Sequence, residues 1–286
     1  MTKSLFIQGL AGVGLVGLKV VEALNQSFKK SKVVKTYPEF FPSAVTVING
    51  HLVLPGISIS HMTKDDISLY SMTGDQPRNP LLTHFFLKSF EDDMRAIYSQ
   101  SPLDLYIAFG ANMINFNPSL EDFDLNSKTK RTATAEEVLK VEATKPREIV
   151  LICSTSELKS TLLENSALPP DISLKIQNYD FLISGLNGVL PSFITQKLAI
   201  PSVAAMVEAS VLPPETPLPS LAAFLGLCSA RKGVQWLQTL CDIQGAEKNL
   251  DNAIEALKPP AIRELSLFLG TPDGEKDSTE DNRMYV

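Results

Sequence analysis

The sequence predicts an α/β fold in which a mixed, largely parallel sheet is flanked by helices. Three observations support this prediction. Short apolar runs typical of buried strands recur along the chain, segments with helical spacing of apolar residues lie between them, and glycine turns follow two of the runs. Strands that alternate with helices are typical of a sheet covered on both faces. We expect residues 1–270 to form a single α/β domain.

The first half of the chain begins with a strand, a turn and a helix. Leu5, Phe6 and Ile7 predict a buried strand, and apolar residues recur at helical spacing from Leu15 to Phe28. Extended segments are expected over 33–38, 44–50 and 51–59, the last two around an Asn-Gly turn at 49–50, which is a strong hairpin signal. An amphipathic helix is expected over 79–99, with one face formed by Leu81, Leu82, Phe85, Phe86, Phe90, Met94 and Ile97.

The second half of the chain continues the alternation. The polar stretch 115–147 is expected to be an exposed loop or short helix. Apolar runs predict strands over 103–111, 148–156, 178–188 and 200–209. Helical spacing predicts helices over 154–164, 189–199, 221–230, 234–240 and 246–257.

The composition argues against several classes of function. The 286 residues carry a formal net charge of -6 and no basic stripe, so nucleic-acid binding is not expected. The three cysteines and three histidines lack the spacing of a metal site or a disulfide framework, so we expect no metal and no cofactor. No run reaches the roughly 18 apolar residues that a membrane span needs. We expect a soluble, cytoplasmic protein with no membrane partner.

A glycine-rich turn follows the first strand. Residues 12–17, GVGLVG, match the G-x-G-x-x-G pattern of dinucleotide-binding turns. Such a site also needs an acidic residue at the tip of the second strand to hold the ribose. Here that segment ends at Pro38, and Glu39 lies beyond it in a turn. The simpler interpretation is that small residues let the helix pack tightly on the sheet at Gly9, Gly12, Gly14 and Gly17.

A second glycine turn, SGLNG at residues 184–188, also follows an apolar run and precedes a helix. Its centre is Leu186 or Asn187, so it is not the G-x-S-x-G nucleophile elbow. Because parallel strands end at one edge of a sheet, the two turns are expected to lie together, with Gly185 and Gly188 as further ligand-binding or structural positions. Acid-base residues do not cluster at either turn, so no catalytic residue is predicted.

These motifs resemble the proteasome assembly chaperone 2 family, which includes archaeal members. The resemblance rests on FIQGLAGVGLVGLKVVEAL at residues 6–24, ISGLNGVL at 183–190 and LAIPSVAAMVEA at 198–209. It covers most of residues 4–233 in order. The resemblance implies a phosphorylase-like α/β fold and a protein that is not an enzyme.

Residues 271–286 differ in composition from the rest of the chain. They contain almost no apolar residue before Met284, and acidic groups outnumber basic ones, which predicts a flexible acidic C-terminal tail. The tail ends in Met284, Tyr285 and Val286, a hydrophobic-Tyr-x (HbYX) triplet. The resemblance implies that the Val286 carboxylate pairs with a lysine between neighbouring α-subunits of the core proteasome. Tyr285 would fill that pocket and Met284 would add apolar contact.

The leading hypothesis is therefore an ATP-independent proteasome assembly chaperone, or a proteasome-binding adaptor or activator, that docks its tail on the α-ring. A single tail on a tether binds weakly, and several tails on one assembly bind through avidity, so a homo-oligomer is expected. The alternative is a nucleoside- or phosphate-binding enzyme or sensor of phosphorylase-like fold that uses the glycine turns.

Overall fold

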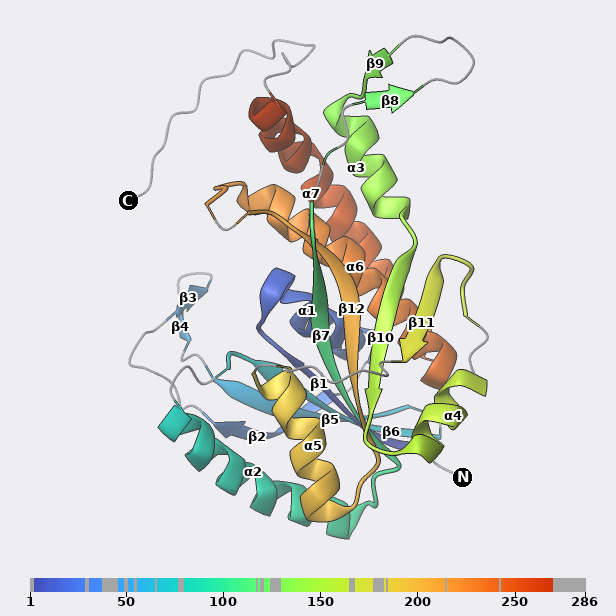
Figure 1. Ribbon diagram of the computed structural model, residues 1–286. Coiled ribbons are helices and arrows are strands. Elements are labelled where there is room, and N and C mark those ends of the chain that lie inside the picture. Colours follow the sequence, from blue (N-terminus) through green and yellow to red (C-terminus); the bar gives the residue numbers. More distant parts are fainter. Residues whose placement is uncertain are drawn as a thin grey trace.

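The computed structural model contains an eight-stranded sheet with helices on both faces, which confirms the predicted α/β class (Figure 1). A two-stranded hairpin, β8 (Glu121–Phe123) and β9 (Lys130–Thr132), lies beyond the N-terminal end of α3 (Ala135–Thr144). The structure describes residues 3–28, 31–37, 46–48, 51–53, 56–64, 66–76, 80–116, 118, 121–123, 130–164, 168–176, 183, 185–213, 215–241 and 243–269.

The sheet is mixed and has a parallel centre. The four central strands β12, β7, β1 and β6 run parallel to one another, and β10 and β11 also pair in parallel. The pairs β10–β12, β5–β6 and β2–β5 are antiparallel. The order across the sheet is β11 (Ile172–Ile176), β10 (Arg147–Cys153), β12 (Ser202–Val211), β7 (Leu105–Asn115), β1 (Lys3–Leu10), β6 (Ile67–Gly74), β5 (Ile57–Lys64) and β2 (Ser31–Tyr37).

Side chains alternate between the two faces of the buried strands and build two cores. On β1, Leu5 and Ile7 belong to the core beneath α1 (Val16–Ser27), α6 (Pro219–Cys241) and α7 (Ala246–Leu269). Phe6 and Leu10 belong to the core beneath α2 (Pro80–Gln100) and α5 (Leu186–Leu198). Both faces are covered, so the central strands are apolar on each side.

Helix α1 lies unusually close to the sheet at its first turn. A Cβ on Gly9 would lie 2.0 Å from the carbonyl oxygen of Gly17, and a Cβ on Gly17 would lie 2.4 Å from the carbonyl oxygen of Phe109. Both distances are far below any real carbon–oxygen contact, so at Gly9 and Gly17 the backbones of β1, α1 and β7 lie in direct contact. The interpretation of these two glycines as packing residues fits this geometry.

The same turn also fixes α6. A 3-10 turn, η1 (Val13–Leu15), precedes α1, and Gly14 adopts a left-handed φ of 63°. A Cβ on Gly226 of α6 would lie 2.1 Å from the carbonyl oxygen of Gly14. The loop therefore touches the helix backbone to backbone, and a larger residue at position 226 would push the two apart, while at Gly14 the left-handed φ is what favours glycine.

The polar stretch 115–147 contains a short helix, one of the two structures expected there, and also the β8–β9 hairpin. Helix α3 (Ala135–Thr144) starts at a capping box in which Thr134 accepts from the Glu137 amide and the Glu137 carboxylate accepts in return. Its far end is held by a buried ion pair between Glu142 and Arg147, with Ser210 of β12 bonded to both.

Several predicted boundaries were wrong. The helices expected over 221–230 and 234–240 are one helix, α6, and β11 was not predicted. Residues 186–188, expected in a strand, begin α5, and residues 177–182 and 184 lie outside the described residues. The hairpin expected around 49–50 is present as β3 (Thr46–Ile48) and β4 (His51–Val53), separate from β5. Helix α4 (Ser156–Glu164) is as expected.

Helix α2 confirms the helix expected over 79–99, although only part of its predicted face is covered. Phe86, Phe90 and Met94 are fully buried at i, i+4 and i+8. Leu81 and Phe85 are 61% and 50% exposed. The predicted apolar face was therefore wider than the surface that the sheet offers.

Gly9→Ala is expected to destabilise the protein by about 2–3 kcal/mol, because the added methyl meets backbone that no side-chain rotation can move. Gly12→Ala is the matched control. Gly12 is extended (φ -157°), and its Cβ would lie 3.7 Å from the nearest atom, Gln76 Nε2, so a change within about 0.5 kcal/mol is expected. Urea unfolding of both variants measures the difference, and equal midpoints would contradict the packing role of Gly9.

Candidate functional site

A cavity of about 480 Å³ lies where the central parallel strands end. Strands β1 and β6 stop at Leu10 and Gly74, while β7 and β12 continue past them with Gly110 opposite Met206. We call this space the strand-end cavity. Its described lining residues are Leu10, Gly12, Val13, Gly17, Gln76, Gly110, Ala111, Asn112, Met113, Ile183, Gly185, Asn187 and Met206.

Both glycine turns contribute to this cavity, and Gln76 connects them. The Gln76 side-chain Nε2 donates to the carbonyl of Ala11 in the first turn at 2.8 Å. Its Oε1 accepts from the amide of Leu186 at the start of α5 at 2.9 Å. Because one partner is a carbonyl and the other an N–H, the orientation of the amide is fixed. Gln76 therefore holds the two turns at a set distance.

A buried series of hydrogen bonds leads from the interior of the sheet to the strand-end cavity. The Tyr106 hydroxyl donates to Gln8 Oε1 at 2.6 Å, and Gln8 Nε2 donates to Asn187 Oδ1 at 2.8 Å. Burial raises the pKa of the Tyr106 hydroxyl well above its ordinary value, so it stays a protonated donor. Gln8 is fully buried and Asn187 is 8% exposed. These hydrogen bonds fix the orientation of the Asn187 amide, with its Oδ1 toward Gln8.

The six predicted glycines have different surroundings. Gly12, Gly17 and Gly185 line the strand-end cavity, and Gly185 caps α5 with a left-handed φ of 79°. Gly9 lies in β1 against Gly17. A Cβ on Gly188 would lie 2.5 Å from Ile183 Cγ2. Gly14 borders a different cavity, formed by helices.

The described lining of the strand-end cavity carries no charge. Its polar side chains are the amides Gln76, Asn112 and Asn187, and the rest is apolar or glycine. A dinucleotide would need an acidic partner for its ribose, and a phosphate is usually held in part by a cation. Neither group is among these described lining residues.

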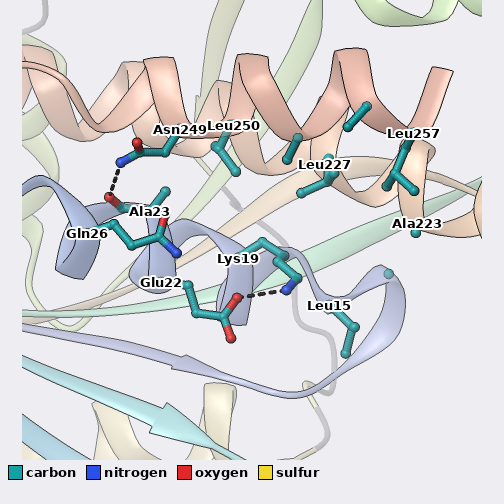
Figure 2. A pocket seen from close by; sticks show the side chains of 13 residues that line it. Leu15, Lys19, Glu22, Ala23, Gln26, Ala223, Leu227, Asn249, Leu250 and Leu257 are labelled. Atoms are coloured by element: carbon teal, nitrogen blue, oxygen red, sulfur yellow. Dashed lines mark hydrogen bonds and ion pairs between the residues drawn. The ribbon is translucent and has the colours of Figure 1, made fainter. Parts of the chain in front are cut away.

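A second space, of about 510 Å³, lies on the other side of the first glycine turn, between α1, α6 and α7 (Figure 2). We call it the helix groove. Leu227, Leu250 and Leu257 give it apolar walls, and Lys19 and Glu22 at its edge pair with each other at 2.7 Å. Its charged groups are thus satisfied within the protein, and it offers mainly apolar contact.

Groups that could serve nucleophilic or metal chemistry are poorly placed in the described part of the chain. Burial raises the pKa of the Cys153 thiol to about 11 and those of Cys228 and Cys241 to about 12, so all three are protonated at neutral pH. Within the described ranges no three His, Cys, Asp or Glu side chains gather as metal ligands. Among the described helices, none is long and apolar enough to cross a membrane.

No protein-family model matches the chain, and no curated protein matches it. Solved structures do match. PbaB from Pyrococcus furiosus, an archaeal proteasome activator, aligns over 92% of this chain and 93% of its own with a TM-score of 0.63 and 15% identity. PbaA from the same organism, an archaeal homolog of proteasome-assembly chaperone, aligns over 94% and 90% with a TM-score of 0.61 and 16% identity.

A PAC2 family protein from Streptomyces avermitilis is also similar, over 91% of this chain and 95% of its own, with a TM-score of 0.59 and 14% identity. The chain has the fold of the proteasome assembly chaperone homologues. The resemblance found in the sequence motifs is thereby confirmed at the level of the fold. With sequence identities of 14–16%, the similarity concerns the fold and nothing further.

Some of the site could not be found from the sequence. Met284, Tyr285 and Val286 lie outside the described residues, so their role stays a prediction. Gln76, Gln8 and Met206 were not singled out, because nothing local marks them: they reach the site from three separate strands or strand ends. Asn187 lies inside the glycine motif at 184–188, which was the one available signal.

Gln76→Ala is expected to destabilise the protein by about 1–2 kcal/mol, because the Leu186 amide and the Ala11 carbonyl both lose their partner. Amide hydrogen exchange over 185–198 should also accelerate, since the first turn of α5 is released. Gln26→Ala, at an exposed position of α1, is the control and should change neither quantity. Unchanged exchange in Gln76→Ala would show that the two turns are held together without this side chain.

Proposed function

We propose that this protein is an ATP-independent proteasome assembly chaperone, or a proteasome-binding adaptor or activator, and not an enzyme. The observation that supports the proposal is the fold shared over more than nine-tenths of the chain with a proteasome activator and a proteasome-assembly-chaperone homolog. We further propose that the protein is cytoplasmic, that it is a chaperone of the archaeal type, and that its partner is the core proteasome.

The proposed contact is the HbYX triplet Met284, Tyr285 and Val286 on the α-ring of the core proteasome. A Val286 carboxylate paired with a lysine is a charge-assisted contact, and an aromatic anchor such as Tyr285 is a frequent hot spot in interfaces. Residues 1–270 would form the folded domain, with residues 271–286 acting as a tether. The docking requires that Val286 carry a free carboxylate.

A homo-oligomer completes the proposal. A flexible tether loses conformational entropy when it binds, so a single triplet has low affinity. Several triplets on one symmetric assembly would engage several α-ring pockets, which raises the overall affinity by roughly 10²–10⁴-fold without new contacts.

Removal of Met284 to Val286 is expected to weaken binding to the core proteasome of the same organism by at least about 100-fold, because the avidity of all tails is lost together. Biolayer interferometry with immobilised core proteasome measures this. Two residues appended after Val286 should weaken binding similarly, since they move the carboxylate away from its lysine. Asn282→Ala is the matched control within the tail and should bind as the full chain does.

Two outcomes of the binding experiment, and one of a second measurement, would contradict parts of the proposal. Binding that survives the deletion would place the contact on the folded domain and contradict tail docking. Absence of binding by every form, at low salt, would overturn the proposed function. Light scattering on the same samples tests the assembly, and a monomer would contradict the avidity argument.

A further inference from the structure

The end of helix α7 carries the most exposed large apolar side chain among the described residues. Leu267 is 78% exposed, and the neighbouring Phe268 is 53% exposed. The contacts of α7 with the core in this part of the helix are made instead by Ala261 and Leu265, which are fully buried. Adjacent exposed apolar side chains are typical of a surface that binds another molecule.

The exposed pair shares one face of α7 with the wall of the helix groove. Ala253, Ala256, Pro260, Arg263 and Leu267 follow one another at spacings of three and four residues, so they lie in line along the helix. The first two line the helix groove, and the last two are exposed. This face therefore has small residues beside a hollow at one end and a projecting apolar pair at the other.

The helix groove suits an apolar side chain. Figure 2 shows Leu227, Leu250 and Leu257 around its space of about 510 Å³. The alanines of α7 let a second helix approach closely, because the distance between packed helices depends on the side chains at the contact. Leu15, at the rim, is 44% exposed and has a left-handed φ of 54°. Such a conformation is costly for a branched side chain and is found mostly at functional positions.

Two charged residues of α7 indicate what the partner is and in which direction it runs. Glu255 and Arg263 are exposed, and neither forms an ion pair with another residue that the structure describes. They lie eight residues apart, which is about 12 Å along a helix. A second α7 in parallel orientation would place like charges together, whereas an antiparallel α7 places each charge beside its opposite.

The apolar and the charged contacts require the same symmetry axis. The midpoint of Ala253 and Leu267 is residue 260, and the midpoint of Glu255 and Arg263 is residue 259. One two-fold axis beside residues 259–260 therefore sets Leu267 against Ala253 of the partner copy and Arg263 against Glu255 of the partner copy. In such an isologous contact each interaction occurs twice.

We propose that this face of α7 binds a second copy of the chain in an antiparallel, two-fold dimer, with Leu267 and Phe268 of each copy seated in the helix groove of the other. The inference rests on the homo-oligomer of the proposed function and gives that oligomer an interface. Its tests need no proteasome, so its failure can be told apart from a failure of proteasome binding.

Sedimentation velocity of the full chain measures the assembly. A dimer, or a larger assembly with an even number of chains, is expected, with a Kd of about 100 µM or lower for the two-fold contact. Leu267→Glu combined with Phe268→Glu would bring charges into an apolar groove and is expected to weaken the contact at least about 100-fold. Ala256→Arg fills the groove and is expected to weaken it at least about tenfold. Val141→Glu, at a 66% exposed position of α3, is the matched control and should assemble as the unmodified chain does.

Charge reversal tests the antiparallel direction. Arg263→Glu and Glu255→Arg each set like charges together at two places, and each is expected to weaken the contact about fivefold or more. The double variant restores opposite charges and is expected to return the Kd to within about twofold of the original. Single variants without effect, or a double variant that does not recover, would overturn the antiparallel arrangement. Circular dichroism melts establish that each variant is folded.

The proposal is overturned if the full chain is monomeric at about 100 µM. It is equally overturned if the assembly survives both the Leu267→Glu, Phe268→Glu variant and Ala256→Arg, because the copies then meet elsewhere. Removal of residues 270–286 should leave the dimer intact. A chain that dimerises only after this removal would show that its own tail, and not a second copy, occupies the groove.

Discussion

The architecture depends on one constraint, the backbone-to-backbone contact at the start of α1. Gly9 of β1 touches Gly17 of α1, and Gly17 in turn touches the backbone of Phe109 on β7. On the opposite side, Gly14 rests against Gly226 of α6. These contacts leave no room for a Cβ, so α1 and α6 are held at a fixed distance from the sheet. The strand-end cavity and the helix groove lie on the two sides of this turn.

The same constraint explains why polar side chains can be held so firmly at the strand ends. With the first turn fixed, Gln76 can bond it to the second turn, and Gln8 can reach Asn187 beneath them. Backbone groups decide the orientation of the Gln76 amide, the Tyr106 hydroxyl decides that of Gln8, and Gln8 in turn decides that of Asn187. The strand-end cavity is thus a pre-organised polar site at the edge where α/β sheets commonly bind ligands. The proposed proteasome contact lies at residues 284–286 and the proposed contact between copies lies along α7, so neither occupies this cavity.

Much of the fold follows from local pattern. The apolar run at Leu5 to Ile7 lies in β1, the runs over 103–111, 148–156 and 200–209 contain most of β7, β10 and β12, and periodic segments between the runs form helices. The errors arose where tertiary packing overrides local signals. Helix α6 continues through Gly233, since that glycine packs against Val20 of α1, and the apolar face predicted for α2 exceeded the surface it covers. Strand β11 was missed although Ile172, Leu174 and Ile176 alternate with polar residues, the pattern typical of a strand at the edge of a sheet.

The sequence by itself determined the fold class, the two glycine turns, the family resemblance and the composition of residues 271–286, because each of these is written in contiguous residues. Tertiary structure decided which glycines pack and which border open space: Gly9 lies against backbone, while Gly12 faces the cavity. It also decided the role of Gln76 and Asn187, which are separated by 111 positions and meet only when the parallel strands align their ends. Hydrogen-bond partners far apart in the chain leave no periodic trace, so only the folded arrangement reveals them.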